Sequence, residues 1–284
     1  MTESIMKRDD FVPFVYGMDH SEGVAWGPDG YVYADGEAGQ IYRVGLDDGS
    51  CEEIGKVGPG ALGICLDADA NVYACSEGTG EVFRTTQEGE VSVYSSGLPE
   101  RKMAVPNYPV FDKAGNMYVS DSNEWDGANG CIFRIKPGGE TEVVSEGTLQ
   151  FPNGMALSPD GTELYIVETN LPGVGKAPIL PDGRLGPIEP VVEMPRIVPD
   201  GVAFDVQDNL YISCYVPGRI YRLSPGGELD ILFDDWQGTL LYGPTNITFG
   251  GADLSTMVTS NIAGTWLTKV QMPYPGIPLP YPKL

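Results

Sequence analysis

One pattern of polar and apolar positions recurs along the chain. A polar residue, often between Pro and Gly, is followed by a short apolar run, a turn such as Asp-Gly, and a second apolar run. The clearest copy is FPNGMALSPDG at 151–161, followed by the apolar run at 164–167. The register position of the pattern falls, about 40 to 47 residues apart, at Glu22, Leu62, Asn107, Asn153, Asp200 and Thr245. A period of this length with several strands per unit is typical of propeller blades.

Each unit contains enough alternating or apolar runs for four strands. In the first unit they are 24–26, 31–34, 40–44 and 51–54, separated by turn residues. We therefore predict an all-β protein, a six-bladed β-propeller with four-stranded blades. It forms one domain over residues 1–284, with blades starting near 22, 62, 107, 153, 200 and 245.

The segments outside this pattern carry predictions of their own. Residues 11–16, FVPFVY, predict an N-terminal strand that closes the ring by completing the last blade, although Pro13 also suits a free edge strand. Residues 122–130 and 169–176 are predicted as longer loops, either roofing the channel mouth or decorating the surface. The tail, 273–284, contains five prolines, so we expect an extended segment over the surface.

The composition narrows the choice of partners. The formal net charge is −23 and the pI is about 4.2, so nucleic acid and anionic membranes would be repelled. No apolar run approaches the length of about 18 residues that a membrane helix needs, and the N-terminus has no signal-like segment. We expect a soluble cytoplasmic protein, either a monomer or a small homo-oligomer.

Cysteine and histidine chemistry is hard to build from this sequence. The five cysteines are odd in number and lack close paired spacing, which argues against a disulfide framework and against a CxxC zinc site. His20 is the only histidine, so neither a His-based triad nor a His-rich metal site is expected.

The register residues are the strongest candidates for chemistry. The first strand of every propeller blade lines the central channel, so Glu22, Asn107, Asn153 and Asp200 would converge near one mouth. Two carboxylates and two amide oxygens would suit one divalent cation, Ca²⁺ above all, with Mg²⁺, Mn²⁺, Fe²⁺ or Zn²⁺ as alternatives. The competing interpretation is that Asn and Asp start strands because they are good turn residues.

The same residues resemble a known family. SEG at 21–23, PN at 106–107, FPNG at 151–154, VET at 167–169 and PDGV at 199–202 resemble the senescence marker protein/gluconolactonase superfamily. That superfamily includes regucalcin-type lactonases and the calcium-dependent diisopropylfluorophosphatase. The resemblance implies a six-bladed propeller with one catalytic divalent ion on the channel axis. It also implies metal ligation by Glu22, Asn153 and Asp200, with Asn107 as a ligand or a substrate contact.

One departure from the family pattern bears on specificity. Regucalcin-type sugar lactonases have Arg two residues before the third-blade Asn and Asp directly after it. Here those positions are Val105 and Tyr108, which lack the polar groups that would grip sugar hydroxyls. Together with Leu62, they predict an apolar flank and a preference for a less polar lactone. The alternative is that Leu62 is buried between blades and never meets the substrate.

We therefore predict a divalent-metal-dependent hydrolase that opens a lactone with metal-activated water. Asp200 is the predicted general base, and Asn107 and Tyr108 would orient the substrate. The predicted pocket wall also includes Leu62, Val105, Glu168, Tyr215 and Asn261. The alternatives are a phosphotriesterase of the diisopropylfluorophosphatase type and a non-catalytic, calcium-stabilised propeller that binds a ligand.

Overall fold

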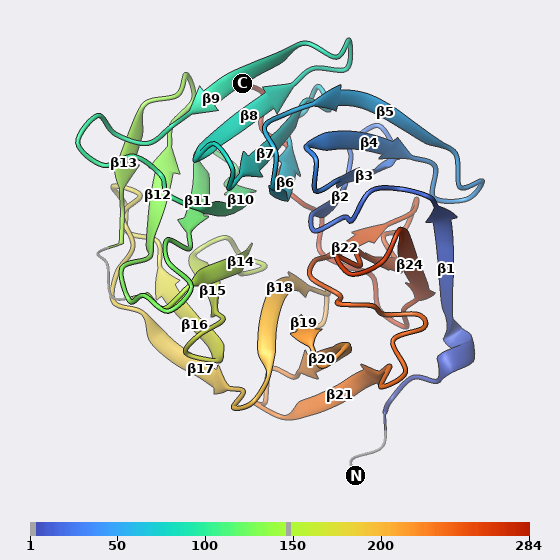
Figure 1. Ribbon diagram of the computed structural model, residues 1–284. Coiled ribbons are helices and arrows are strands. Elements are labelled where there is room, and N and C mark those ends of the chain that lie inside the picture. The colour runs from blue at the N-terminus through green and yellow to red at the C-terminus, as the bar shows by residue number, and fades with distance from the viewer. Residues whose placement is uncertain (1–3, 146–148) are drawn as a thin grey trace.

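Six four-stranded antiparallel sheets form a ring around a central channel (Figure 1). The computed structural model describes residues 4–145 and 149–284. Its described helical content is one short 3₁₀ helix, η1 (Arg8–Asp10), which precedes the first strand. The predicted fold class, a six-bladed all-β propeller with four-stranded blades, is confirmed.

The first three blades follow chain order from the channel outward. Blade 1 contains β2 (Val24–Trp26), β3 (Val32–Asp35), β4 (Gln40–Val44) and β5 (Cys51–Lys56). Blade 2 contains β6 (Ala61–Leu66), β7 (Val72–Ser76), β8 (Glu81–Thr85) and β9 (Val91–Ser95). Blade 3 contains β10 (Pro106–Phe111), β11 (Met117–Asp121), β12 (Cys131–Ile135) and β13 (Thr141–Val143).

The remaining blades complete the ring. Blade 4 contains β14 (Pro152–Leu157), β15 (Glu163–Glu168), β16 (Gly173–Pro178) and β17 (Glu189–Glu193). Blade 5 contains β18 (Val198–Phe204), β19 (Leu210–Val216), β20 (Arg219–Leu223) and β21 (Leu229–Asp234). Blade 6 contains β22 (Ile247–Gly250), β23 (Thr256–Thr259), β24 (Trp266–Gln271) and, as its outer strand, β1 (Phe11–Tyr16).

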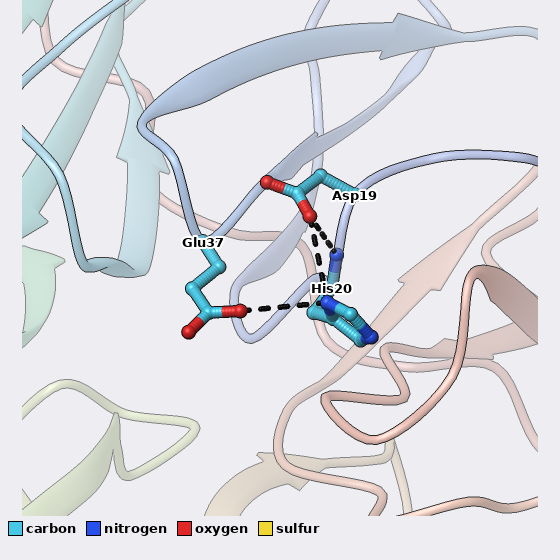
Figure 2. A group of neighbouring side chains, drawn as sticks. All are labelled: Asp19, His20 and Glu37. Carbon is cyan, nitrogen blue, oxygen red and sulfur yellow. Dashed lines mark hydrogen bonds and ion pairs between the residues drawn. The ribbon is translucent and has the colours of Figure 1, made fainter.

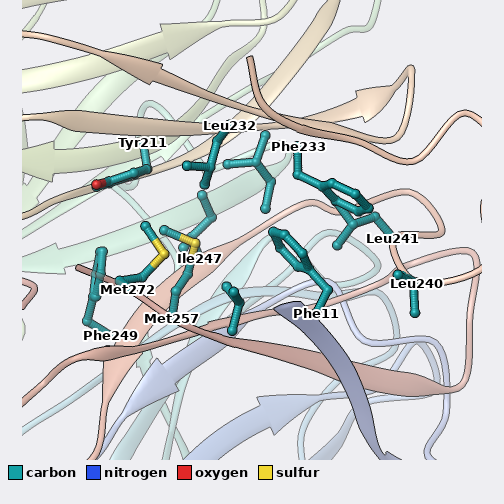
Figure 3. Close-up of a cluster of buried hydrophobic side chains, with 12 residues drawn as sticks. Phe11, Tyr211, Leu232, Phe233, Leu240, Leu241, Ile247, Phe249, Met257 and Met272 are labelled. Atoms are coloured by element: carbon teal, nitrogen blue, oxygen red, sulfur yellow. The ribbon is translucent and has the colours of Figure 1, made fainter. Parts of the chain in front are cut away.

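The N-terminal strand closes the ring, as predicted. β1 pairs antiparallel with β24, so one blade combines the two ends of the chain. Phe11 of β1 stacks on Phe233 of β21, with ring centroids 4.1 Å apart and an interplanar angle of 18°. Figure 3 shows this pair within a buried apolar cluster shared by blades 5 and 6. The closure is therefore held by packing across the seam as well as by strand pairing.

The inner strands share an irregularity that places the register residues. In β10 the pairing runs from Pro106↔Asp121 directly to Pro109↔Val119, and the register shifts between them. Comparable shifts occur in β6, β14 and β18. The residues inside each shift have no ladder partner, which frees their side chains from the regular alternation of a strand. Asn107, Asn153 and Asp200 all lie in these segments.

The predicted loop at 169–176 is wrong in extent. β15 ends at Glu168 and β16 begins at Gly173, so the connection is only 169–172 and the rest is strand. The glycines at 173 and 175 were read as loop residues, but they pair within the sheet. The other predicted loop, 122–130, does connect β11 to β12, and its Trp125 packs edge-on against Phe151 at 4.7 Å.

The C-terminal tail crosses the face where the inner strands end. The Pro275 backbone oxygen accepts the Val206 N–H at 2.9 Å. The Pro282 backbone oxygen accepts the Ala68 N–H, also at 2.9 Å. The tail therefore runs from blade 5 to blade 2, and in Figure 1 the chain ends behind the ring near β8 and β9. This is the face opposite the register residues, which lie where the inner strands begin.

Candidate active site

Four buried oxygen-bearing side chains come from four different blades. Glu22 precedes β2, and Asn107, Asn153 and Asp200 lie near the starts of β10, β14 and β18. Their exposed fractions are only 3 to 6%, although all four are polar or charged. Buried polar groups are normally hydrogen-bonded, so their partners decide what this cluster can do.

One side-chain oxygen in each of three of these residues lacks a hydrogen-bond partner in the described chain. The Oδ1 atoms of Asn107, Asn153 and Asp200 are buried and accept no hydrogen bond from the described part of the chain. A buried acceptor left unsatisfied costs about 1–3 kcal/mol. The Asn153 Nδ2 donates to Thr169 Oγ1 at 3.2 Å. This hydrogen bond sets the orientation of the amide, so the unpartnered atom is its oxygen. Three such oxygens at equivalent ends of neighbouring strands are the arrangement that a bound cation would satisfy.

Glu22 is held firmly by its surroundings. Asn246 Nδ2 donates to Glu22 Oε2 at 3.1 Å, and Ser260 Oγ donates to the Glu22 backbone oxygen at 2.6 Å. Thr245, the sixth register residue, donates its hydroxyl to the same backbone oxygen at 2.8 Å. Thr245 therefore supports Glu22, and its hydroxyl proton is already engaged.

The electrostatics of the cluster also favour a cation. Burial raises the pKa of Glu22 well above its usual range, and the nearby negative charge of Asp200 raises it further. Burial likewise raises the pKa of Asp200. Two buried carboxylates facing each other are unfavourable unless a positive charge compensates them. An all-oxygen donor set of carboxylates and amides fits a hard divalent ion such as Ca²⁺ or Mg²⁺.

A pocket with a volume of about 310 Å³ opens at this end of the channel. Glu22 lies in its wall together with Leu62 and Tyr215, two residues predicted to contact substrate. The rest of the wall is His20, Glu37, Gly60, Ala61, Glu77, Ile262 and Ala263. The wall therefore combines three carboxylates, those of Glu22, Glu37 and Glu77, with the apolar surface of Leu62, Tyr215 and Ile262.

Two predicted substrate contacts from blade 3 lie elsewhere. Val105 is partly exposed and donates its backbone N–H to Asp121 Oδ1 at 2.7 Å. Tyr108 is buried, and it lines a separate apolar cavity deeper in the channel. Its backbone N–H donates to Ser120 Oγ at 3.0 Å. The register shift in β10 turns Asn107 and Tyr108 to different surroundings, which spacing alone did not reveal.

The last two predicted wall residues have structural partners. Glu168 accepts the Gln150 backbone N–H at 2.7 Å and lines an outer pocket of blade 4, while burial raises its pKa. Asn261 is fully buried, and its Oδ1 accepts the Tyr242 backbone N–H at 2.8 Å. Its Nδ2 donates to Thr268 Oγ1 at 3.0 Å. Asn261 therefore braces a loop of blade 6.

The supporting residues were missed by sequence reasoning. Asp35 and Asp121 end the second strands of their blades, and each accepts backbone N–H groups beside a register segment. Ser260 likewise accepts the Asn246 backbone N–H at 3.0 Å, whereas Thr169 donates its hydroxyl to the Pro199 backbone oxygen at 2.8 Å, beside the register residue of blade 5. A signal was present, because each of these polar residues follows its own register residue by 13 to 16 positions.

Figure 2 shows a further group at the rim, formed by Asp19, His20 and Glu37. The His20 Nδ1 lies 3.4 Å from Asp19 Oδ1 and 3.4 Å from Glu37 Oε2. Asp19 also accepts the Ala38 backbone N–H at 2.9 Å. These contacts anchor the imidazole at the edge of the pocket.

Within residues 4–145 and 149–284, no helix is long and apolar enough to span a membrane. The fold and the site together define a six-bladed propeller with four buried oxygen-bearing side chains near the starts of its inner strands. The chain belongs to the SMP-30/Gluconolactonase/LRE-like family, whose sequence profile matches residues 20–262.

Relatives with assigned names agree with this membership. The chain is 29% identical over 192 residues to a gluconolactonase from Zymomonas mobilis, which covers 60% of this chain and 53% of that protein. It is 25% identical over 252 residues to lactonase drp35 from Staphylococcus saprophyticus, covering 82% of this chain and 76% of that protein. The match to the Zymomonas protein thus spans about half of its length.

Solved structures share the fold at low sequence identity. A gluconolactonase from Xanthomonas campestris superposes with a TM-score of 0.78 and 19% identity, covering 92% of this chain and 89% of that chain. A calcium-binding protein, regucalcin, from Agrobacterium tumefaciens has a TM-score of 0.76 and 15% identity, with coverage of 96% and 95%.

Proposed function

We propose that this chain is a divalent-metal-dependent lactonase. The observation that carries the proposal is the set of buried Oδ1 atoms of Asn107, Asn153 and Asp200, which lack hydrogen-bond partners in the described chain, together with the buried carboxylate of Glu22, whose pKa burial and the charge of Asp200 both raise. Family membership adds the reaction class, because two relatives carry the names gluconolactonase and lactonase.

Glu22, Asn107, Asn153 and Asp200 would hold the ion, and Ca²⁺ suits this donor set best. When bound, such an ion polarises a carbonyl oxygen and lowers the pKa of bound water. The chain's own residues prepare the site. Asn246 orients the Glu22 carboxylate through a 3.1 Å hydrogen bond, and Thr169 orients the Asn153 amide.

Asp200 is the proposed general base. Its Oδ1 has no partner in the described chain, so the carboxylate can hold the ion through one oxygen and accept a proton at the other. The pocket beside Glu22 would hold the lactone ring, with Leu62 and Tyr215 against its apolar part. The carboxylates of Glu37 and Glu77 in the pocket wall would repel the carboxylate that ring opening produces, which favours product release.

A substrate panel with and without EDTA tests the proposal. It contains γ- and δ-lactones, aryl esters and organophosphate triesters, each assayed again after adding back Ca²⁺, Mg²⁺, Mn²⁺ or Zn²⁺. The expected result is lactone hydrolysis that EDTA abolishes and one metal restores. Turnover of triesters alone would favour a phosphotriesterase. No turnover, combined with stabilisation by Ca²⁺, would favour a ligand-binding propeller.

The Asp200→Asn variant tests whether Asp200 acts as the general base or only supports the fold. It keeps the size of the side chain and loses the proton acceptor, so lactone turnover should fall at least about 100-fold. Asp205→Asn is the matched control, because Asp205 is also buried and directly follows β18, whereas Asp200 lies near the start of that strand. Wild-type turnover in Asp200→Asn would exclude the assigned role.

A further inference from the structure

A second cavity lies deeper in the channel than the candidate site. Its volume is about 80 Å³, well above the roughly 10–15 Å³ that one water requires. All six inner strands contribute to its wall, and four tail residues, Ile277, Leu279, Pro280 and Tyr281, complete it. No charged side chain of the described residues lines it.

The sequence explains why this space is left open. Three positions after each register residue, every inner strand carries a small side chain, and all six line the cavity: Ala25, Cys65, Val110, Ala156, Ala203 and Thr248. Leu or Phe at these positions would fill the axis. The cavity is therefore a repeated feature of the blades, and it does not depend on a packing defect at one site.

The cavity adjoins an apolar pocket on the outer face. That pocket has a volume of about 450 Å³ and shares four wall residues with the cavity: Phe249, Ile277, Leu279 and Tyr281. Its other walls include Trp26, Pro28 and Leu254, and again no charged side chain of the described residues takes part. The two spaces therefore share part of their walls.

The tail segment that lines both spaces is held by few hydrogen bonds. Tyr281 donates its hydroxyl to the Trp26 backbone oxygen at 2.7 Å, and Ile277 donates its N–H to the Phe204 oxygen at 3.1 Å. Leu279, between these anchors, is 40% exposed. The segment between the two anchors can therefore move without breaking any strand pairing.

We propose that the channel cavity is a second ligand site, which takes a small, uncharged, mainly hydrocarbon molecule entering beneath the tail. Apolar cavities of this kind stay dry and bind small apolar molecules. An anionic ligand is disfavoured, because the protein carries a net charge of −23 and the cavity offers no cation. The site lies away from the mouth pocket, and its test requires no lactonase activity.

Cys65 is a built-in reporter for this site. It lines the cavity and keeps some accessible surface, while burial raises the pKa of its thiol. Cys51 is exposed, and Cys75, Cys131 and Cys214 are buried. In a Cys51→Ser background, Cys65 should therefore be the thiol that reacts first. Methyl methanethiosulfonate is a suitable probe, because the thiolate attacks its sulfenyl sulfur, forms a methyl disulfide and releases methanesulfinate.

The expected result has three parts, all read by intact-protein mass at one mildly alkaline pH. The neutral reagent modifies Cys65, whereas its anionic 2-sulfonatoethyl analogue, which reacts by the same displacement, does so much more slowly. Benzene slows the neutral reaction, by about twofold when its concentration equals its Kd. Tyr281→Phe, which removes the hydroxyl anchor of the tail, speeds the reaction.

Filling the cavity provides the control. Ala156→Leu should abolish protection by benzene, and Ala203→Val serves if that variant fails to fold. Ala128→Leu, on the exposed 122–130 loop, should leave the protection unchanged. Equal rates with the neutral and anionic reagents would overturn the proposal. The proposal would also fail if Cys65 stayed unmodified and benzene did not raise the Tm. Protection of Cys65 by benzene that persists in the filled variants would overturn it as well.

Discussion

The carboxylate of Asp35 accepts the backbone N–H of Glu22 at 2.8 Å. The same carboxylate accepts the N–H of Gly23 at 3.0 Å, and burial raises its pKa despite these bonds. A Cβ at Gly23 would lie 2.3 Å from the Leu62 backbone oxygen, so this segment is tightly packed between blades 1 and 2. Asp35 therefore fixes the backbone that presents Glu22 to the channel.

Replacing Asp35 should weaken metal binding without touching a metal ligand. Asp35→Asn replaces a charge-assisted acceptor with a neutral amide, which should cost about 1.5–3 kcal/mol of stability. The loosened Glu22 should also lower Ca²⁺ affinity by about 10- to 100-fold, the usual effect of losing an outer-shell partner. Calcium titration calorimetry and the Ca²⁺-induced shift in Tm measure the two effects.

The control for this prediction is Asp205→Asn. Asp205 is fully buried and accepts the Tyr211 hydroxyl at 2.9 Å and the Asn209 N–H at 3.0 Å, at the far end of blade 5. This variant should lose similar stability and keep its calcium affinity. If both variants bind Ca²⁺ as tightly as the parent, Asp35 has no positioning role.

Ring closure predicts a large effect at one aromatic residue. Phe11 is 4% exposed and stacks on Phe233 across the seam between blades 5 and 6 (Figure 3). Phe11→Ala should lower the free energy of unfolding by about 3–5 kcal/mol in urea titration. Val12→Ala, at a position 49% exposed on the same strand, should change it by less than about 0.5 kcal/mol. Equal effects would mean that the seam contributes little.

Most of the architecture could be predicted from the sequence because each blade repeats the same short signals. The register residue, polar in every blade but the second, returns every 40 to 47 residues with its apolar run and turn, and FVPFVY at 11–16 is long enough to form a strand. The loop at 169–176 was mispredicted because Gly173 and Gly175 signal turns locally, whereas pairing with β15 and β17 holds them in a strand.

The site could be predicted only in part. Glu22, Asn107, Asn153 and Asp200 share one position in the repeat, and the topology places them at the same end of their inner strands. The placement of Tyr108 did not follow from the topology, because the register shift in β10 decides which way neighbouring side chains face. The amide of Asn261 could in principle bind a ligand, but its oxygen and nitrogen are already hydrogen-bonded to Tyr242, Trp266 and Thr268. The sequence alone does not show these hydrogen bonds.

A cross-strand ion pair in blade 3 predicts a pH dependence of stability. The Arg134 Nε donates to Glu142 Oε1 at 3.0 Å. Partial burial alone would raise the pKa of Glu142, but the hydrogen bond and charge of Arg134 hold it below its usual range. The native state therefore releases this proton at a lower pH than the unfolded state does. The resulting stability is present above the unfolded pKa of about 4.3 and is lost as the pH falls through the native pKa.

Glu142→Gln should therefore be less stable than the parent by about 1 kcal/mol at pH 7. The difference should shrink as the pH falls below about 4. Glu140→Gln is the control, because Glu140 is exposed and pairs with Lys136 at the surface at 2.8 Å. Urea titrations from pH 3 to pH 7 measure both variants, and a difference that is independent of pH would contradict the linkage.

The mouth pocket predicts a preference among lactones. Leu62 and Tyr215 supply apolar surface in a pocket whose wall also contains the carboxylates of Glu37 and Glu77. A lactone with an alkyl substituent should therefore have a higher kcat/KM than polyhydroxylated gluconolactone, by about 10- to 200-fold, the usual range for apolar contacts. Leu62→Ser should reduce this ratio, while Val93→Ser, at an exposed position on an outer strand, should leave it unchanged. The ratio is the appropriate measure because a partly unfolded variant lowers both rates equally. Equal kcat/KM values for the two substrates, or a preference for the sugar lactone, would exclude an apolar specificity pocket at this mouth.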